Sequence, residues 1–161
     1  MDGPPLLIAW HSRTGAAAAM ARAACEGAGE RARSMHCDDV QPADLIAARG
    51  YLFACPENLA SMSGAMKEMF DRCYYPVLGR IEGRPYATLI AAGSDGEGAQ
   101  RQIDRIATGW RLRRVAEPLI VNLAAQTPAA ILAPKVVPQV SLASCRELGT
   151  ALAEGLALGL F

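Results

Sequence analysis

Short apolar runs alternate along the chain with stretches in which apolar residues recur every three or four positions. The first run covers residues 6–10, and the alanine-rich stretch 16–28 follows it after a short polar segment. The run is typical of a buried strand and the stretch is typical of a helix. The same alternation is then repeated toward the carboxyl end.

The repeated pattern predicts five strands and five helices. Strands are expected at residues 6–10, 32–36, 51–55, 86–92 and 113–121. Helices are expected at residues 16–28, 41–48, 64–73, 99–108 and 142–158. Loops are expected at residues 56–63 and 93–98, and residues 122–140, which hold three prolines, are predicted to be irregular surface chain.

Alternating strands and helices imply an α/β fold in which helices cover both faces of a parallel sheet. Five such strands suit the doubly wound order 2-1-3-4-5. In sheets of this kind a ligand binds beyond the carboxyl ends of the first and third strands. Neither an internal repeat nor a linker interrupts the pattern, so residues 1–161 are predicted to form a single domain.

The composition argues against several kinds of partner. Lys plus Arg and Asp plus Glu are equal at 16 each, so no net field attracts nucleic acid or an anionic membrane. No apolar stretch has the length and purity of a transmembrane helix, and the amino end does not resemble a signal peptide. Five scattered cysteines without a C-x-x-C pair predict free thiols in a cytoplasmic protein.

Three loops follow predicted strands and should therefore meet at one edge of the sheet: residues 11–17, 56–63 and 93–98. The first places the hydroxyls of Ser12 and Thr14, and the backbone N–H groups around Gly15, at the start of a helix. Unpaired N–H groups and the helix dipole favour a phosphate there, and Arg13 can add charge. The sequence therefore predicts a phosphate site at this edge, although Ser12 or Thr14 could instead serve only as a helix cap.

The sequences of these loops resemble those of flavin-binding proteins. SRTGAA at residues 12–17 resembles the phosphate loop of flavodoxins, with Ala17 where threonine is usual. PENLASMSGAMK at residues 56–67, completed by Asp71, is similar to the signature of NAD(P)H-dependent FMN reductases and flavodoxin-like quinone reductases. GSDGEG at residues 93–98 resembles their glycine-rich loop beside the flavin ring.

This resemblance implies a flavodoxin-like fold that holds FMN and receives electrons from NAD(P)H. The electrons would pass to a small-molecule acceptor, either a quinone or a free flavin. FMN would supply the chemistry, so no side chain is expected to act as an acid or a base, and no metal site is expected. The residues expected to contact the cofactor are Ser12, Arg13, Thr14, Gly15, Ala16, Ala17, Pro56, Glu57, Asn58, Leu59, Ala60, Met62, Gly93, Ser94, Asp95, Gly96 and Gly98.

Three other functions remain open from the sequence. One is a flavodoxin-type electron carrier without NAD(P)H activity, which the balanced charge disfavours because such carriers dock through complementary charge. Another is a cysteine phosphatase, since Cys25 and Arg31 are separated by five residues, but Cys25 falls inside a predicted helix. The third is a protein that keeps the fold without the cofactor.

The carboxyl-terminal helix suggests a homodimer. Its apolar residues exceed what one core face needs, and twofold dimers are common. These residues are Leu152, Leu156, Leu158, Leu160 and Phe161.

Overall fold

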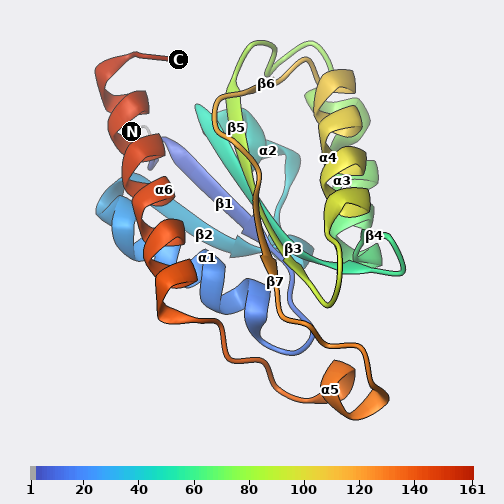
Figure 1. Cartoon of the computed structure of the whole chain (residues 1–161). Helices are drawn as coiled ribbons and strands as arrows, with labels where there is room; N and C mark the ends of the chain where they lie inside the picture. Colours follow the sequence, from blue (N-terminus) through green and yellow to red (C-terminus); the bar gives the residue numbers. More distant parts are fainter. Residues whose placement is uncertain (1–2) are drawn as a thin grey trace.

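A parallel sheet forms the centre of the protein, and the computed structural model describes residues 3–161 (Figure 1). The strands that pair in parallel are β1 (Leu6–Trp10), β2 (Ala32–His36), β3 (Gly50–Asn58), β5 (Pro85–Ala92), β6 (Arg113–Arg114) and β7 (Leu119–Asn122). Their order is β2-β1-β3-β5-β6, with β7 also paired to β5. The predicted doubly wound, flavodoxin-like sheet with order 2-1-3-4-5 is confirmed, since β6 and β7 together occupy the fifth position.

The fifth strand is not the continuous segment 113–121 that the pattern predicted. The N–H of Val115 still donates to Tyr86 O at 3.0 Å, but pairing stops before β7 begins. Pro118, which has no N–H to donate, lies in this interruption. The predicted strand was therefore too long, since a proline cannot donate an N–H to the ladder.

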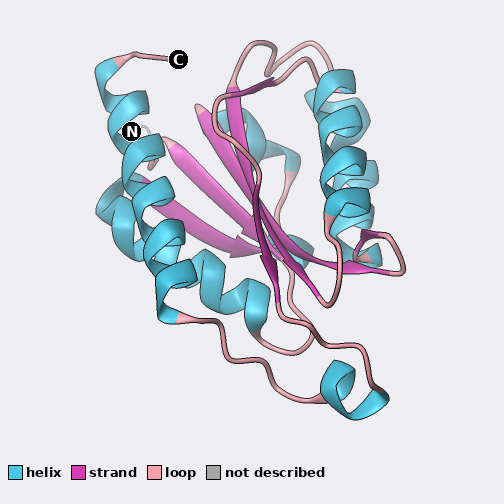
Figure 2. Cartoon of the chain, viewed as in Figure 1, coloured by secondary structure: helices cyan, strands magenta, loops and turns pink. Residues whose placement is uncertain are grey.

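Helices cover both faces of the sheet, as predicted (Figure 2). On one face lie α1 (Ala16–Ala28) and α6 (Gln139–Leu158), and on the other lie α2 (Pro42–Ala47), α3 (Gly64–Val77) and α4 (Glu97–Gly109). Short 3-10 turns occur at Gly29–Arg31 and Cys37–Asp39. The segment predicted to be irregular contains one further short helix, α5 (Pro128–Leu132), which Thr127 caps through its side chain.

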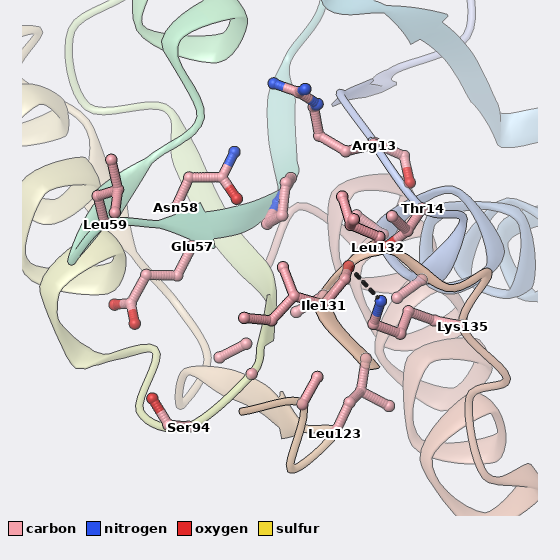
Figure 3. A pocket seen from close by; sticks show the side chains of 18 of the residues that line it. Arg13, Thr14, Glu57, Asn58, Leu59, Ser94, Leu123, Ile131, Leu132 and Lys135 are labelled. Atoms are coloured by element: carbon pink, nitrogen blue, oxygen red, sulfur yellow. Dashed lines mark hydrogen bonds between the residues drawn. The ribbon is translucent and has the colours of Figure 1, made fainter. Parts of the chain in front are cut away.

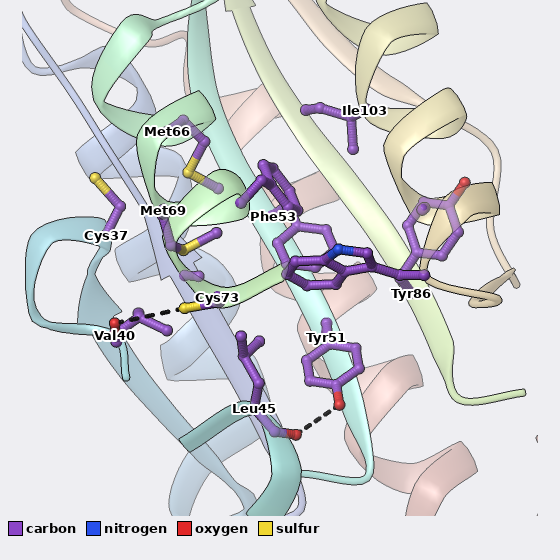
Figure 4. Packing of buried hydrophobic residues seen from close by; sticks show 14 of the residues in the cluster. Cys37, Val40, Leu45, Tyr51, Phe53, Met66, Met69, Cys73, Tyr86 and Ile103 are labelled. Carbon is purple, nitrogen blue, oxygen red and sulfur yellow. Dashed lines mark hydrogen bonds between the residues drawn. The ribbon is translucent and has the colours of Figure 1, made fainter. Parts of the chain in front are cut away.

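The two faces of the sheet bury alternate residues of each strand. In β3, Tyr51 and Phe53 pack under α3 and α4, whereas Leu52 and Ala54 pack under α1 and α6. Figure 4 shows the first of these cores, in which the Tyr51 hydroxyl donates to Leu45 O at 2.6 Å. The methionines at positions 62, 66 and 69 are all buried in this core.

Helices α1 and α6 approach each other closely enough to require glycine. A Cβ at Gly27 would overlap the carbonyl oxygen of Arg146, and a Cβ at Gly149 would overlap that of Ala24. The Thr150 hydroxyl donates to Gly27 O at 2.9 Å. Backbone therefore packs against backbone at this crossing, which holds the last helix on the first.

The structure changes the basis of the predicted dimer. Leu152 and Leu156 of α6 are buried in the core and are therefore not available to a partner. Leu158 and Leu160 remain 72% and 68% exposed, and Phe161 lies against Gly155. A homodimer stays a prediction that rests on these last residues alone.

Candidate functional site

A cavity of about 560 Å³ lies beyond the carboxyl ends of β1, β3 and β5 (Figure 3). It is bounded by the loop after β1, by the end of β3 and the turn that follows it, by the end of β5, and by the segment that contains α5. The lining residues are Ser12, Arg13, Thr14, Ala16, Ala17, Pro56, Glu57, Asn58, Leu59, Ala60, Ala91, Ala92, Gly93, Ser94, Leu123, Ala125, Ile131, Leu132 and Lys135.

The first wall of the cavity is built for an anion. Gly15 precedes α1 with a φ of 102°, which favours glycine, and no side chain caps the helix. The Ser12 hydroxyl accepts from Gly15 N at 3.2 Å, whereas no hydrogen bond from the Thr14 hydroxyl occurs within the described chain. The first N–H groups of α1 are therefore available to a ligand.

The second wall is a hairpin, not the loop predicted for residues 56–63. Strand β3 runs on to Asn58 and pairs antiparallel with β4 (Ser61–Met62). Leu59 and Ala60 form the turn with φ values of 53° and 64°, as in a two-residue hairpin turn that usually contains Asn and Gly. The sequence signal was missed because neither residue is a usual turn former, and Leu59 is 100% exposed at the tip.

Glu57 connects this hairpin to the third loop. Its carboxylate accepts from Gly96 N at 2.8 Å and from Ala99 N at 3.0 Å. Both donors lie at the start of α4, where a negative charge also complements the helix dipole. Glu57 therefore fastens the second wall to the third, a role that its place among the predicted cofactor contacts did not indicate.

Close packing explains the glycines of the third loop. A Cβ at Gly93 would lie 2.7 Å from Ala125 O, one at Gly96 would overlap the Ile120 side chain, and one at Gly98 would overlap Ala60 O. Gly96 also has a φ of 97°. Helix α4 begins at Glu97 rather than at residue 99, so Glu97 and Gly98, predicted to be loop, are helical.

The fourth wall was missed by the sequence analysis. Leu123, Ala125, Ile131, Leu132 and Lys135 all line the cavity, although residues 122–140 were predicted to be irregular surface chain. The N–H of Lys135 donates to Thr14 O at 2.8 Å and so joins this segment to the first loop. No local pattern reveals such a contact, since it depends on the path of the chain after β7.

The two histidines lie beside the site without lining it. His11 Nδ1 is 2.7 Å from Ser63 Oγ, and the ring centroids of His11 and His36 are 5.7 Å apart. Burial lowers the pKa of His11 below its usual value of 6.5, and the charge of His36 lowers it further. The charge of Asp38 raises this pKa in part, and the charge of Arg13 lowers it. The fold therefore favours the neutral form of His11.

This lowered pKa predicts a loss of stability in acid. Below about pH 6.5 the unfolded chain binds a proton at His11 more readily than the folded chain does, so the free energy of unfolding should decrease toward the lower folded-state pKa. Urea unfolding at pH 7.5, 6.5 and 5.5 measures the slope. The His11→Asn variant should show a weaker dependence over this range, and an unchanged slope would contradict the assignment.

A sequence model described as NADPH-dependent FMN reductase matches residues 23–119, which is more than half of the chain. The chain belongs to the NADPH-dependent FMN reductase family. The matched part contains the second and third loops and begins after the phosphate loop. Comparison with curated proteins gives no match.

Solved structures resemble this FMN reductase family member over nearly all of its length. An archaeal flavodoxin has a TM-score of 0.75 at 18% identity, covering 94% of this chain and 98% of its own. A flavodoxin, WrbA-like protein from Agrobacterium tumefaciens has a TM-score of 0.73 at 18% identity, covering 92% and 94%. Rubredoxin oxygen:oxidoreductase from Desulfovibrio gigas has a TM-score of 0.74 at 14% identity, covering 99% of this chain but 38% of its own. At these identities the likeness concerns the fold.

The cavity of this FMN reductase family member suits an FMN molecule. Its volume lies within the range of about 300–1,000 Å³ that small-molecule sites occupy. One end offers the N–H groups of α1, the Thr14 hydroxyl and the positive charges of Arg13 and Lys135, as a phosphate requires. The remainder is largely aliphatic, and within residues 3–161 no aromatic side chain lines it. Family membership and this chemistry together support an FMN-binding flavoprotein.

Most of the residues predicted to contact the cofactor lie together in this cavity. The five that do not line it are Gly15, Met62, Asp95, Gly96 and Gly98. Met62 is buried in the core, Asp95 is exposed, and the three glycines have the local roles described above. Direct contact between the cofactor and any of the seventeen residues remains a prediction.

The arrangement around Cys25 does not suit a phosphatase. Cys25 lies within α1 and Arg31 in the following 3-10 turn, so no loop after a strand cradles an anion between them. Burial raises the pKa of Cys25, and Glu26 raises it further. The thiol therefore has neither the exposed strand-end position nor the lowered pKa of a nucleophile.

Proposed function

We propose that the protein binds FMN in this cavity and uses NAD(P)H to reduce a quinone or a free flavin. The supporting observation is that three loops, each similar to a flavin-binding motif, meet around one cavity whose only cationic lining side chains in residues 3–161, Arg13 and Lys135, lie on either side of Thr14 (Figure 3). Family membership supplies the expectation of a nicotinamide donor. FMN, when bound, supplies the hydride and electron transfer.

The protein's own groups would bind and orient this cofactor. Thr14 and the first N–H groups of α1 hold the phosphate. Leu123, Ile131 and Leu132 offer an apolar wall that excludes water from one side. Among the lining residues within 3–161, Glu57 is the only one with an acidic side chain. Both of its oxygens accept backbone N–H groups, so it serves to position the hairpin and need not transfer protons.

Cofactor content and NAD(P)H oxidation test this proposal. The purified protein, or the protein incubated with FMN and desalted, should be yellow and should oxidise NADPH or NADH when a quinone or free FMN is supplied. Bound FMN without nicotinamide oxidation would favour the electron carrier. If FMN does not bind and saturating FMN does not raise the melting temperature, the result would favour a protein that keeps the fold without the cofactor.

The Thr14→Ala variant should bind FMN about tenfold to a hundredfold more weakly than the wild type, since a hydrogen bond to a charged group contributes about 1.5–3 kcal/mol. Riboflavin lacks the phosphate, so its dissociation constant should hardly change. Titration of flavin fluorescence measures both ligands. Thr108→Ala, at an exposed position on α4, is the matched control. Equal losses for FMN and riboflavin would mean that Thr14 supports only the shape of the loop.

A further inference from the structure

Lys135 occupies an unusual position for a surface lysine. It is one of two lysines in the chain, and it lines the cavity that Lys67 does not reach. The N–H of Lys135 donates to Thr14 O at 2.8 Å. Its backbone is therefore held against the loop that is expected to bind phosphate.

The Lys135 ammonium group is also held in place. Its Nζ donates to Ile131 O at 2.8 Å and to Ala133 O at 2.7 Å, at the end of α5. Figure 3 shows the bond to Ile131 on the cavity side of this segment, beside Thr14. An ammonium has three N–H donors, so one donor remains for a further acceptor. Because the side chain is already ordered, an anion binding there would pay little of the usual entropy cost.

Arg13 is the other cation of the cavity and differs in this respect. Its side chain is exposed, and no hydrogen bond from it to another residue occurs within the described part of the chain. Its guanidinium must lose its freedom before it can hold a ligand. Lys135 is therefore the better placed of the two to fix an anion.

We infer that Lys135 is a phosphate ligand and that residues 128–135 and the α1 loop together form a clamp around the FMN phosphate. The inference rests on the FMN binding proposed above. Ala17 lacks the hydroxyl that the flavodoxin loop usually provides, and the third donor of Lys135 supplies a charged one in its place. A phosphate monoester carries a charge of about −1.5 to −2 at pH 7. The amino end of a helix carries only about half a positive charge, so it cannot balance the phosphate by itself.

The same chemistry could serve the 2′-phosphate of NADPH. The contact between Lys135 and Thr14 favours the FMN phosphate, because Thr14 belongs to the phosphate loop itself. The two sources are separated by measuring FMN binding without any nucleotide, and by comparing NADPH with NADH as electron donor.

The test measures dissociation constants for FMN and riboflavin in the wild type, Lys135→Gln and Lys67→Gln. Lys67 pairs with Asp71 on the surface of α3, with Nζ 2.7 Å from Oδ1, and is the matched control for loss of one lysine charge. We expect Lys135→Gln to weaken FMN binding about tenfold or more. Riboflavin binding should stay within about twofold in both variants, because neither changes the ring site. Raising the salt concentration should weaken FMN binding to the wild type more than to Lys135→Gln.

Lys135→Arg separates charge from folding. It keeps the positive charge and should bind FMN more tightly than Lys135→Gln while melting at a similar temperature. If the wild type binds neither flavin, the proposed function fails and the clamp fails with it. If the wild type binds FMN and Lys135→Gln binds it equally well, the clamp alone is wrong. Equal losses for FMN and riboflavin, or a loss confined to the preference for NADPH over NADH, would also overturn it.

Discussion

The Gly149→Ala variant should melt about 5–10 °C below the wild type, since overpacking costs about 1–3 kcal/mol or more and each kcal/mol moves the melting temperature of a domain this size by about 2–4 °C. The added Cβ would overlap the carbonyl oxygen of Ala24 on α1. A carbonyl within a helix cannot rotate away, so the two helices must separate. The separation would loosen the face of the core that contains Leu152 and Met20.

Gly109→Ala is the matched control for this substitution. Gly109 ends α4, and a Cβ there would meet no other atom within 4 Å. Alanine generally lowers the entropy of the unfolded chain relative to glycine, so this control should melt at or slightly above the wild-type temperature. Thermal unfolding followed by circular dichroism compares the three proteins. Similar melting of Gly149→Ala and the control would mean that α6 shifts without cost.

Several helix boundaries could be predicted because they depend on local pattern, and the strand order could be predicted because alternating strands and helices favour few topologies. Helix α1 was placed at its observed limits, since Gly15 and Gly29 flank an alanine-rich run that favours a helix. The sheet edge that carries the cavity followed from the order of the strands alone. None of these predictions required knowledge of the long-range contacts between side chains.

The hairpin and the fourth wall could not be predicted, because long-range contacts decide them. Leu59 and Ala60 adopt left-handed backbone conformations that their side chains disfavour, and Glu57 stabilises the hairpin by binding the start of α4 from 39 residues away. The hydrogen bond from Lys135 N to Thr14 O depends on the path of residues 122–140, whose prolines predict only irregular chain. Met62, one of the predicted cofactor contacts, is buried in the core and does not line the cavity.

The Gly98→Ala variant should lose affinity for FMN and riboflavin by similar factors. A Cβ on Gly98 would overlap Ala60 O and lie 3.2 Å from Glu57 Oε2. The hairpin turn would have to move away from α4, which strains the carboxylate bonds of Glu57 to Gly96 and Ala99. Because the hairpin lines the cavity away from the phosphate loop, its displacement should weaken binding of the flavin ring.

The size and pattern of this loss distinguish the ring site from the phosphate site. Overpacking costs about 1–3 kcal/mol, so we expect flavin affinity to decrease about tenfold or more, with a smaller decrease in melting temperature than in Gly149→Ala. Gly64→Ala is the control, since Gly64 also lies in the first turn of a helix and a Cβ there has free space. Thr14→Ala and Lys135→Gln should weaken FMN alone, whereas Gly98→Ala should weaken both flavins. If Gly98→Ala instead bound riboflavin as the wild type does, the hairpin would not contact the ring, and the flavin would have to lie against the segment that contains α5.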